Sequence, residues 1–521
     1  MHPRIRAGSS DQIGRLLSDQ RIVSKPKSKA TSPGASSADA AGTPPVARQH
    51  RLQRAVGLLI FGTAAAGAGL LWWSVSGTSR PADDPTDGTL GAWHVLYDPQ
   101  APALTTLTAA TGLALLFAAG VAMIERRIAT LARRSDDGDR LPLSPRRVMN
   151  ETRGVFHGPV TVTVLVPAHD EEQAIGATLA SLRQQDPPPD RVVVVADNCT
   201  DRTVEIARAC GVDVIETVGN RHKKAGALNQ ALTALLPAQG ENDLVMVMDA
   251  DTVLDPGFIA SAVRRMTQDR GLMAIGGLFY GEDGMGLIGQ FQRNEYTRYA
   301  RDLRRRRGRV FVLTGTATVF RPRALRTVAA ERGRMLPGVP GDVYDTLVLT
   351  EDNEITLALK VLGGLIVSPA ECTVVTEVMP TWRALWAQRL RWQRGALENL
   401  GEYGVRTATF RYWAQQLGIG YGVIALFAYL LLMFLMLTSF DQWVWFPFWL
   451  GTGLVFTVER VVTVWSGGWR ARLLAATLFP ELVYALYLDI VYLKGIIDMS
   501  VGRTATWKHV VQSPSTARAD A

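Results

Sequence analysis

Acidic side chains stand at the ends of three short apolar runs in the middle of the chain. Glu171 follows the first run, Asp197 the second, and Asp249 and Asp251 end the fourth. Because Asp249 and Asp251 are separated by one residue, their side chains point the same way in an extended chain. Mg²⁺ and Mn²⁺ are held by one or two carboxylates together with substrate phosphate oxygens. Turn formation or helix capping would explain any one of these residues, but three strand ends together predict a divalent-metal site.

A lysine opens the helical pattern at 225–235. Lys224 is unfavourable at a helix N-terminus, which repels cations. A phosphate bound there would offset that repulsion, because the helix end itself favours anions. Lys224 therefore predicts a phosphate site, with a solvated basic turn as the alternative.

A second acidic pair, Glu351 and Asp352, precedes a helical pattern at 355–362. Acidic residues in a first helical turn are often only capping groups, and Thr350 alone would serve as the cap. The pair therefore has two interpretations on its own, a capped helix start or a catalytic carboxylate.

The segment 382–397 combines an apolar face with a chemically distinctive polar one. At about 100° per residue, the following side chains share one helical face: Trp382, Leu385, Trp386, Leu390 and Leu397. Gln388, Arg391 and Trp392 fall on the opposite side. We expect the apolar face to pack on a membrane surface. Tryptophan stacks on sugar rings and arginine binds diphosphate bidentately, so the polar face predicts a sugar-phosphate site, with a juxtamembrane anchor as the alternative.

Alternating strand and helix patterns determine where these side chains lie. Apolar or β-branched runs occur at 161–166, 192–196, 212–218 and 244–249, with helical patterns between them at 173–184, 203–210 and 225–235. This alternation predicts parallel strands with crossover helices, a doubly wound α/β sheet. Ligands of such sheets bind outside the carboxyl ends of the strands, where the acidic residues are expected.

The N-terminal part of the chain is of two kinds. Residues 1–54 are rich in Ser, Ala, Pro and basic side chains, which predicts a disordered arm. Residues 55–124 contain uncharged runs at 56–75 and 103–124, each long enough to span a bilayer. They predict two transmembrane helices.

The remainder is predicted to be a cytosolic domain at 125–410, with an interfacial helix near 381–400, followed by two or three transmembrane or interfacial helices at 411–497 and a polar tail at 498–521. Apolar runs at 412–440 and 443–458 are the clearer spans. The run at 473–493 contains Pro480, so it is either a span or a hairpin or interfacial helix broken at that proline.

Net charge and cysteine content exclude several classes of protein. The formal net charge of the 521 residues is +8, and basic residues flank both sides of the first predicted helix pair. That distribution predicts a multi-pass plasma (inner) membrane protein with its catalytic domain in the cytosol, so the charge indicates membrane lipids rather than nucleic acid as partners. Three cysteines exclude a disulfide scaffold.

Six short motifs carry a resemblance to a known family. In chain order they are PAHDEE, ADNCTD, KAGALN, DAD, TED and QRLRW. This order resembles the membrane-embedded family 2 glycosyltransferases, which include cellulose, chitin, hyaluronan and poly-N-acetylglucosamine synthases. Three longer stretches are most similar to the poly-N-acetylglucosamine type: VLTGTATVFRPRAL, LTEDNEITLALK and MPTWRALWAQRLRWQRG.

The resemblance implies a GT-A fold, a nucleotide-diphosphate sugar donor, usually UDP-linked, and Mg²⁺ or Mn²⁺ as cofactor. Asp352 would be the general base, with Glu351 beside it, and Asp249 and Asp251 would engage the metal and diphosphate. The donor pocket would be formed by Pro167, His169, Glu171, Asp197, Lys224 and Asp249. The diphosphate and acceptor would be held by Gln388, Arg391, Trp392, Gly315 and Thr316.

The function that the resemblance implies is inverting transfer of a sugar to a growing polysaccharide. Coupling of this transfer to export is a further hypothesis from the resemblance, and the sequence does not identify an export partner. Single-sugar transfer to a lipid, such as a polyprenyl phosphate or a glycolipid, is the second hypothesis. A catalytically silent membrane scaffold is the third, and the intact acidic motifs argue against it.

Overall fold

The computed structural model describes residues 159–269, 271–306, 308–438, 443–445 and 447–503, together with short strands at 86–90 and 93–97 and residues 119, 120 and 123. The predicted arm at 1–54, nearly all of the two predicted spans at 55–124, and residues 504–521 of the tail lie outside the described residues.

The central element is a seven-stranded sheet in the order β11-β8-β10-β6-β3-β4-β5. Its bounds are β3 (Thr161–Ala168), β4 (Arg191–Ala196), β5 (Asp213–Glu216), β6 (Asp243–Met248), β8 (Leu272–Gly276), β10 (Ala317–Phe320) and β11 (Leu365–Val367). The four predicted strands are present, and β5, β4, β3 and β6 are parallel neighbours. The sheet as a whole is mixed rather than doubly wound and parallel, because β10 runs antiparallel to both β6 and β8. It is the α/β sheet of a GT-A-like domain.

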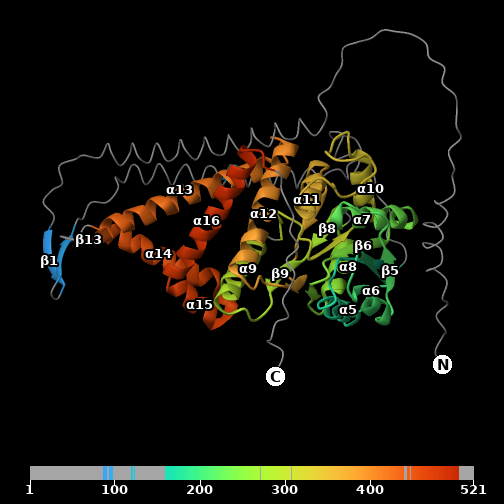
Figure 1. The fold of residues 1–521 in the computed structure, drawn as a ribbon, viewed down its shortest axis with the longest axis horizontal. Coiled ribbons are helices and arrows are strands. Elements are labelled where there is room, and N and C mark those ends of the chain that lie inside the picture. The colour runs from blue at the N-terminus through green and yellow to red at the C-terminus, as the bar shows by residue number, and fades with distance from the viewer. Residues whose placement is uncertain are drawn as a thin grey trace, which may run out of the picture.

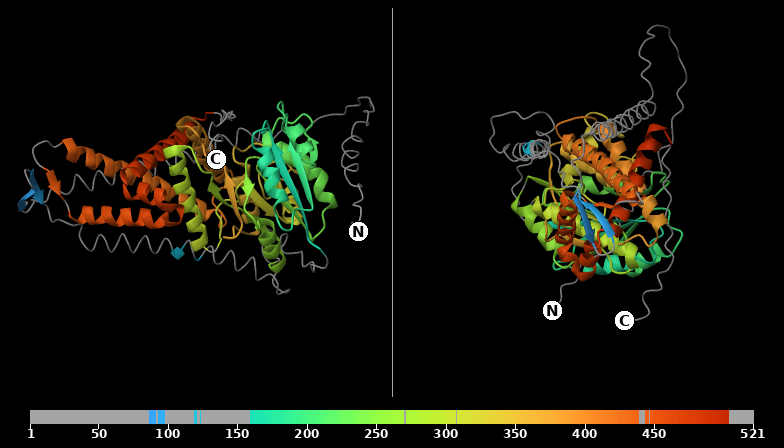
Figure 2. Two further views of the ribbon diagram at one scale, coloured as in Figure 1. Left: turned by 90° about the horizontal axis from the view of Figure 1, so that it is seen from below. Right: turned by 90° about the vertical axis from the view of Figure 1, so that its left-hand side faces the viewer.

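Helices cover both faces of the sheet because adjacent strand residues point to opposite sides. Leu165 and Val245 belong to one buried cluster, and Val164 and Met246 belong to the other. The first face is covered by α7 (Lys223–Leu235, continued by η3, Leu236–Ala238), α10 (Pro322–Glu331) and α11 (Glu351–Val361). The second is covered by α5 (Ile175–Arg183), α6 (Thr203–Ala209) and α8 (Phe258–Gln268). The sheet and its helices occupy one end of the molecule (Figure 2).

Two small sheets join distant segments. One contains β7 (Val253–Leu254), β12 (Thr373–Thr376) and β9 (Leu278–Gly281), and it brings the chain that follows β12 beside Asp251. The other contains β1 (Thr86–Leu90), β2 (Trp93–Tyr97) and β13 (Trp443–Trp445), with β2 parallel to β13. It lies at the far end of the helical part, away from the central sheet (Figure 1).

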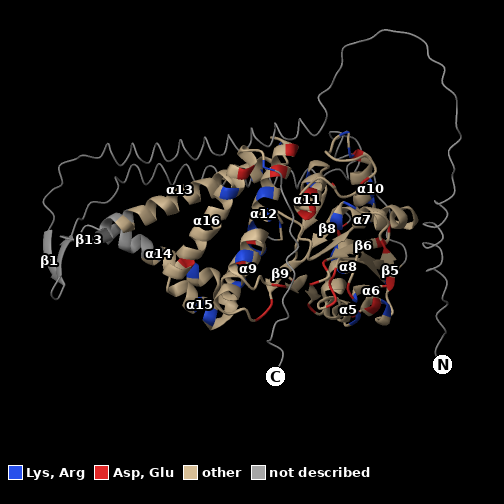
Figure 3. Ribbon diagram, viewed as in Figure 1, with Lys and Arg blue, Asp and Glu red and all other residues tan. Residues whose placement is uncertain are grey.

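The helical part is formed by α9 (Gly286–Arg305), α12 (Trp382–Tyr403), α13 (Phe410–Thr438), α14 (Pro447–Thr463), η4 (Trp465–Gly467), α15 (Gly468–Ala476) and α16 (Phe479–Ser500). Among the described residues, one stretch is long and apolar enough to cross a membrane, Phe410–Leu431 of α13. The bent pair Trp465–Ala476 and Phe479–Ser500 would add a second if the pair counts as one span. Charged side chains are sparse along α13 and frequent on α9 and α12 (Figure 3).

The structure corrects one sequence expectation for these helices, and for another it has the broken form that was one of two alternatives. The run at 443–458 is not one continuous helix, because its first residues form β13 and α14 continues to Thr463, past Glu459 and Arg460. The run at 473–493 is interrupted before Pro480, and the two helices meet at 91°. The bend follows Leu478, whose φ is 53°, whereas Pro480 lies in the first turn of α16, where its missing N–H leaves no bond unmade.

The apolar face of α12 packs against α16, not directly on a membrane surface as predicted. Leu385 shares a buried cluster with Tyr484, and Leu397 shares another with Tyr492. A Cβ at Gly495 would be 3.7 Å from Leu390 Cδ1, an ordinary van der Waals contact, so the two helices pack closely at this point. The periodicity correctly indicated a covered face but not the element that covers it.

Candidate active site

Lys224 joins two carboxylates at the carboxyl end of the sheet. Its Nζ lies 2.5 Å from Asp249 Oδ1, just after β6, and 2.8 Å from Glu351 Oε1, at the start of α11. Burial alone would lower the pKa of this lysine, but Asp249 and Glu351 outweigh burial and hold its pKa well above the usual value. Lys224 is therefore a fixed positive charge, and the alternative of a solvated basic turn is wrong.

Gly315 lies against this ion-paired group. Its N–H donates to Asp352 Oδ2 at 3.3 Å, and its carbonyl accepts from the Asp249 N–H at 3.2 Å. A Cβ at this position would stand 2.8 Å from Lys224 Nζ and 3.0 Å from Asp249 Oδ2. The adjacent Thr316 accepts from Asp249 N–H through its carbonyl at 3.2 Å. The loop between α9 and β10 thus brings the predicted residues of three motifs together, and a Cβ at 315 would force the Lys224 ammonium to move.

We expect Gly315→Ala to displace the Lys224 ammonium, since the flexible end of that side chain is the easiest atom to move. Nucleotide-sugar turnover should fall by about tenfold or more, while the melting temperature changes little. Gly176→Ala in α5 is the control, because a Cβ there meets nothing within 4 Å. Equal turnover by the two variants in a coupled nucleotide-release assay would show that the close fit at 315 has no functional importance.

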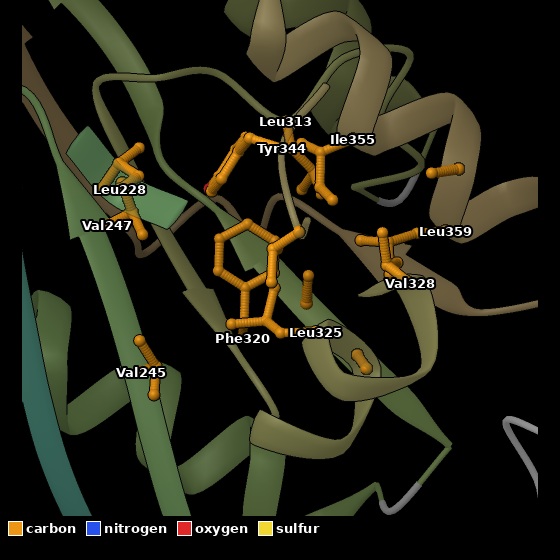
Figure 4. Close-up of a cluster of buried hydrophobic side chains, with 14 of the residues drawn as sticks. Leu228, Val245, Val247, Leu313, Phe320, Leu325, Val328, Tyr344, Ile355 and Leu359 are labelled. Carbon is orange, nitrogen blue, oxygen red and sulfur yellow. The ribbon is translucent and has the colours of Figure 1, made fainter. Parts of the chain in front are cut away.

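Asp352 borders a pocket with a largely apolar lining. The pocket between it and Lys224 is lined by Leu228, Val247, Leu313, Phe320, Tyr344 and Ile355, and these side chains are part of the buried cluster in Figure 4. Burial, followed by the charge of Glu351, raises the pKa of Asp352 to about 6. Burial also raises the pKa of Glu351, but Lys224 and, to a smaller extent, Arg391 bring it below its usual value. Two adjacent carboxyl groups therefore have pKa values shifted in opposite directions.

Thr350 does not cap α11 with its side chain. Its Oγ1 and its carbonyl oxygen instead accept hydrogen bonds from Asn399 Nδ2 of α12, at 3.2 and 3.1 Å. The capping explanation for this motif is therefore wrong for Thr350, and the residue serves as a contact between α11 and α12.

A second group of carboxylates surrounds Asp251. Burial and then Asp249 raise the pKa of Asp251 to about 6. Burial, Asp251, Glu377 and Asp249, in that order, raise the pKa of Glu171 to about 8. Such mutual repulsion is relieved by a cation, and an all-oxygen donor set suits Mg²⁺ or Mn²⁺. The residues present therefore fit a divalent metal held by Asp249 and Asp251.

The predicted donor-pocket residues lie next to this group along β3 and β4. Asp197 Oδ1 accepts hydrogen bonds from Asn198, Thr217 and Asn220, at 2.9, 2.8 and 2.8 Å. His169 Nδ1 lies 2.5 Å from the Asp197 carbonyl oxygen. Pro167 is buried within β3, paired with β4, and the backbone N–H of Glu171 donates to Thr203 Oγ1 at 2.8 Å. The structure gathers these residues at one edge of the sheet.

Arg391 lies close to Lys223, the first residue of α7, and to Glu351, the first residue of α11. Burial lowers the pKa of Lys223, and the charge of Arg391 lowers it further. Gln388 and Trp392 are on the same side of α12, and both are partly exposed. Of the three predicted residues of this helix, Arg391 is thus brought to the acidic motifs, whereas the contacts of Gln388 and Trp392 are with Arg389.

Comparison with known proteins places part of the chain in a family. The family model "Glycosyl transferase family 2" matches residues 163–329, from β3 to α10. Residues 163–329 are a glycosyltransferase family 2 segment. The matched family 2 segment contains Lys224, Asp249, Asp251 and Gly315, whereas Asp352 and α12 lie beyond it.

The family 2 chain is distantly related to poly-beta-1,6-N-acetyl-D-glucosamine synthases. It is 24% identical over 246 residues to the enzyme of that name from Staphylococcus epidermidis and 26% identical over 249 residues to that of Staphylococcus aureus (strain COL). Each match covers 46% of this chain and 55% of the relative. The matched segment therefore spans about half the length of these curated relatives.

Two solved structures are among the similar folds. A mannosyltransferase from Pyrobaculum calidifontis, in complex with GDP-Man and Mn²⁺, has 18% identity and a TM-score of 0.40, covering 75% of this chain and 98% of that one. Glucosyl-3-phosphoglycerate synthase from Mycobacterium tuberculosis, in complex with Mn²⁺, UDP and phosphoglyceric acid, has 19% identity and a TM-score of 0.32, covering 52% and 86%.

Two buried polar residues near the family 2 site were not predicted. Asn229 accepts from the Val343 and Tyr344 N–H groups, at 3.1 and 2.8 Å, and donates to the Tyr344 carbonyl at 2.8 Å. It fixes the loop that carries Tyr344 to the pocket. Arg389 is 3% exposed. The sequence did contain a signal for it, because at 100° per residue Arg389 falls about 40° from Leu385, inside the apolar face of α12.

Proposed function

We propose that this protein is an inverting membrane glycosyltransferase that transfers a sugar from a UDP-linked nucleotide-diphosphate donor to a growing polysaccharide. The observation that carries the proposal is the pair of groups at the carboxyl end of the sheet. A carboxylate with a raised pKa, Asp352, stands beside a lysine that is held charged by Asp249 and Glu351.

These groups fit the two requirements of the transfer. In an inverting reaction, an acceptor hydroxyl attacks the anomeric carbon as the nucleotide diphosphate leaves, and the hydroxyl proton must be accepted. Asp352 is the proposed general base. Lys224, with Arg391, is proposed to stabilise the charge on the leaving diphosphate. A divalent metal on Asp249 and Asp251 would supply further charge stabilisation when bound.

The acceptor and the membrane location are inferred from the helical part. Trp392 is partly exposed on the side of α12 that carries Arg391, and a tryptophan face can stack on a sugar ring. The apolar stretch of α13 and the bent pair α15–α16 would lie in or on the membrane, with the catalytic domain on the cytosolic side. The relatedness to poly-beta-1,6-N-acetyl-D-glucosamine synthases supports a polysaccharide product.

The proposal is tested with the purified full chain in lipid nanodiscs, supplied with Mg²⁺ or Mn²⁺ and a panel of radiolabelled UDP- and GDP-sugars. A product of high molecular weight from one donor is expected, with Asp352→Asn as the inactive reference. A lipid carrying one sugar would contradict the polysaccharide acceptor. Absence of turnover with every donor, the same as in Asp352→Asn, would contradict the enzymatic proposal.

Mn²⁺ binding provides a separate prediction. We expect Asp251→Asn to weaken Mn²⁺ binding by on the order of tenfold or more, because even residues that only orient metal ligands have effects of that size. Titration of free Mn²⁺ by electron paramagnetic resonance measures this without turnover. Glu241→Gln is the control, since Glu241 is exposed and interacts with Arg326 away from the site. Equal affinity in both variants would remove Asp251 from the metal site.

The rate of transfer should depend on pH through Asp352. Its raised pKa of about 6 means that the carboxylate, the form that accepts a proton, predominates above that pH and is lost below it. Turnover should therefore rise with pH through about 6. Glu351→Gln should move this acidic limb to lower pH, because it removes a negative charge that raises the Asp352 pKa. Glu331→Gln at the end of α10 should leave the limb unchanged.

A further inference from the structure

Arg389 is a buried cation whose partners belong to three different helices. On α12 itself, Nη1 donates to Gln388 Oε1 at 2.9 Å. On α9, Nη2 lies 3.0 Å from Glu295 Oε2 and 3.5 Å from the Tyr296 hydroxyl. On α16, Tyr484 donates its hydroxyl to the same Glu295 Oε2 at 2.8 Å.

The guanidinium of Arg389 also stacks on a residue of the proposed acceptor site. Its Cζ lies 4.3 Å from the centre of the Trp392 ring. Arg389 thus contacts Trp392 and Gln388, two of the three α12 residues assigned to acceptor and diphosphate, while being only 3% exposed itself. A cation over a tryptophan face is attracted to the ring and favours one ring position, and Trp392 remains partly exposed.

The two helices that support Arg389, α9 and α16, are joined to each other by a second ion pair. Arg298 of α9 donates to both carboxylate oxygens of Glu481 at 2.6 Å, and Asn294 donates to Glu481 Oε1 at 3.0 Å. Glu481 lies in the first turn of α16, just after the bend. Three residues of α9 within two turns, Asn294, Glu295 and Arg298, therefore reach the start of α16.

We propose that Arg389 is a positioning residue that holds the Trp392 ring and the Gln388 amide in place for the acceptor, with α9 and α16 as its support. This inference rests on the proposed function, because it presumes that Trp392 meets an acceptor sugar. It assigns the junction of α9, α12 and α16 a role in acceptor placement in addition to packing.

An arginine is required for this geometry. The planar guanidinium group donates to Gln388 through Nη1 and to Glu295 through Nη2, while the flat face of the same group lies against the Trp392 ring. A lysine ammonium retains the charge but can neither stack nor donate in two fixed directions. Arg389→Lys should therefore keep the ion pair with Glu295 but lose the stacking contact with the Trp392 ring.

The test compares Arg389→Met and Arg389→Lys with Trp392→Ala and with the double variant Arg389→Met/Trp392→Ala, all in nanodiscs. Arg383→Met is the matched control, an exposed arginine on the same helix. The measurements are polymer yield and length, UDP affinity in the presence of Mn²⁺, melting temperature, and the ¹⁹F resonance of 5-fluorotryptophan at 392, identified by its loss in Trp392→Phe.

We expect both Arg389 variants to shift or broaden the resonance of residue 392 and to lower polymer yield by about a hundredfold, the scale for displacing a positioned group by about an ångström. UDP affinity should stay within about twofold, and Arg389→Met should add little to Trp392→Ala, because residues acting through one another are not additive. Arg383→Met should match the wild type in every measurement.

Four results would overturn the inference: an unmoved resonance, full activity of Arg389→Lys, additive losses in the double variant, or a loss of UDP affinity in parallel with yield. The fluorine resonance decides the question even for a preparation without turnover. Failure of the proposed function is separate, since it would appear as a wild type that makes no polymer, or as polymer yield unchanged by Trp392→Ala.

Discussion

Replacing Asp352 with asparagine is expected to lower the rate of sugar transfer by about 10²- to 10⁴-fold, the usual contribution of a general base. The amide has nearly the same shape and can still accept the hydrogen bond from Gly315 N–H, now 3.3 Å from Asp352 Oδ2. What it cannot do is accept the proton of the acceptor hydroxyl. Steady-state release of nucleotide diphosphate from the preferred donor measures the loss.

The control for this experiment is Asp302→Asn on α9, where the carboxylate is exposed and paired with Arg306. That variant should turn over the donor at the rate of the wild type. Both variants should bind UDP and melt as the wild type does, because neither change removes buried volume. An Asp352→Asn protein that retains more than about a tenth of the activity would contradict the role of Asp352 as general base.

Replacing Arg332 with methionine is expected to destabilise the protein by about 3–5 kcal/mol, the cost of removing one partner from a buried ion pair. Arg332 and Glu354 have fully buried side chains, and their nitrogens and oxygens are 2.5 Å apart at the closest contact. Arg332 also donates to the carbonyls of Pro337 and Val343, and Tyr403 of α12 donates to Glu354. The substitution leaves the Glu354 carboxylate buried without its cation, and the melting temperature should fall by roughly 10 °C.

The exposed neighbour Arg334 provides the matched variant, and Arg334→Met should leave the melting temperature unchanged. The double variant Arg332→Met/Glu354→Met should recover part of the loss, because it removes the unpaired carboxylate as well. If the losses of stability from Arg332→Met and Glu354→Met simply added in the double variant, the two side chains would not be acting as a pair.

The main features of the catalytic domain were predictable because its signals are local and periodic. The runs that became β3, β4, β5 and β6 were identified, and the carboxyl ends of parallel strands necessarily share one edge of the sheet. That geometry is why Asp249 and Lys224, separated by a strand and a helix in the sequence, were expected at one site. Their contact at 2.5 Å agrees with the expectation.

The remaining features depend on contacts that a linear pattern does not specify. An apolar run such as β10 carries no information about strand direction, so the antiparallel insertion between β6 and β8 was missed. The apolar face of α12 indicated burial but not its partner, α16. Pro480 correctly marked a helix boundary, but prolines favour the first turn of a helix as well as its end, so the break lies at Leu478, just before the proline, rather than at the proline itself.

The pairing of β2 with β13 has a consequence for the order of assembly. Residue 93 and residue 443 are 350 positions apart, and their strands lie side by side in one small sheet. At about 5–20 residues per second, a ribosome needs roughly 20 to 70 s between making the first of these strands and the second. During that interval the edge of β2 has no native neighbour, although the catalytic sheet between the two segments can already form. The early hairpin must therefore be kept from pairing elsewhere until the last third of the chain has been made.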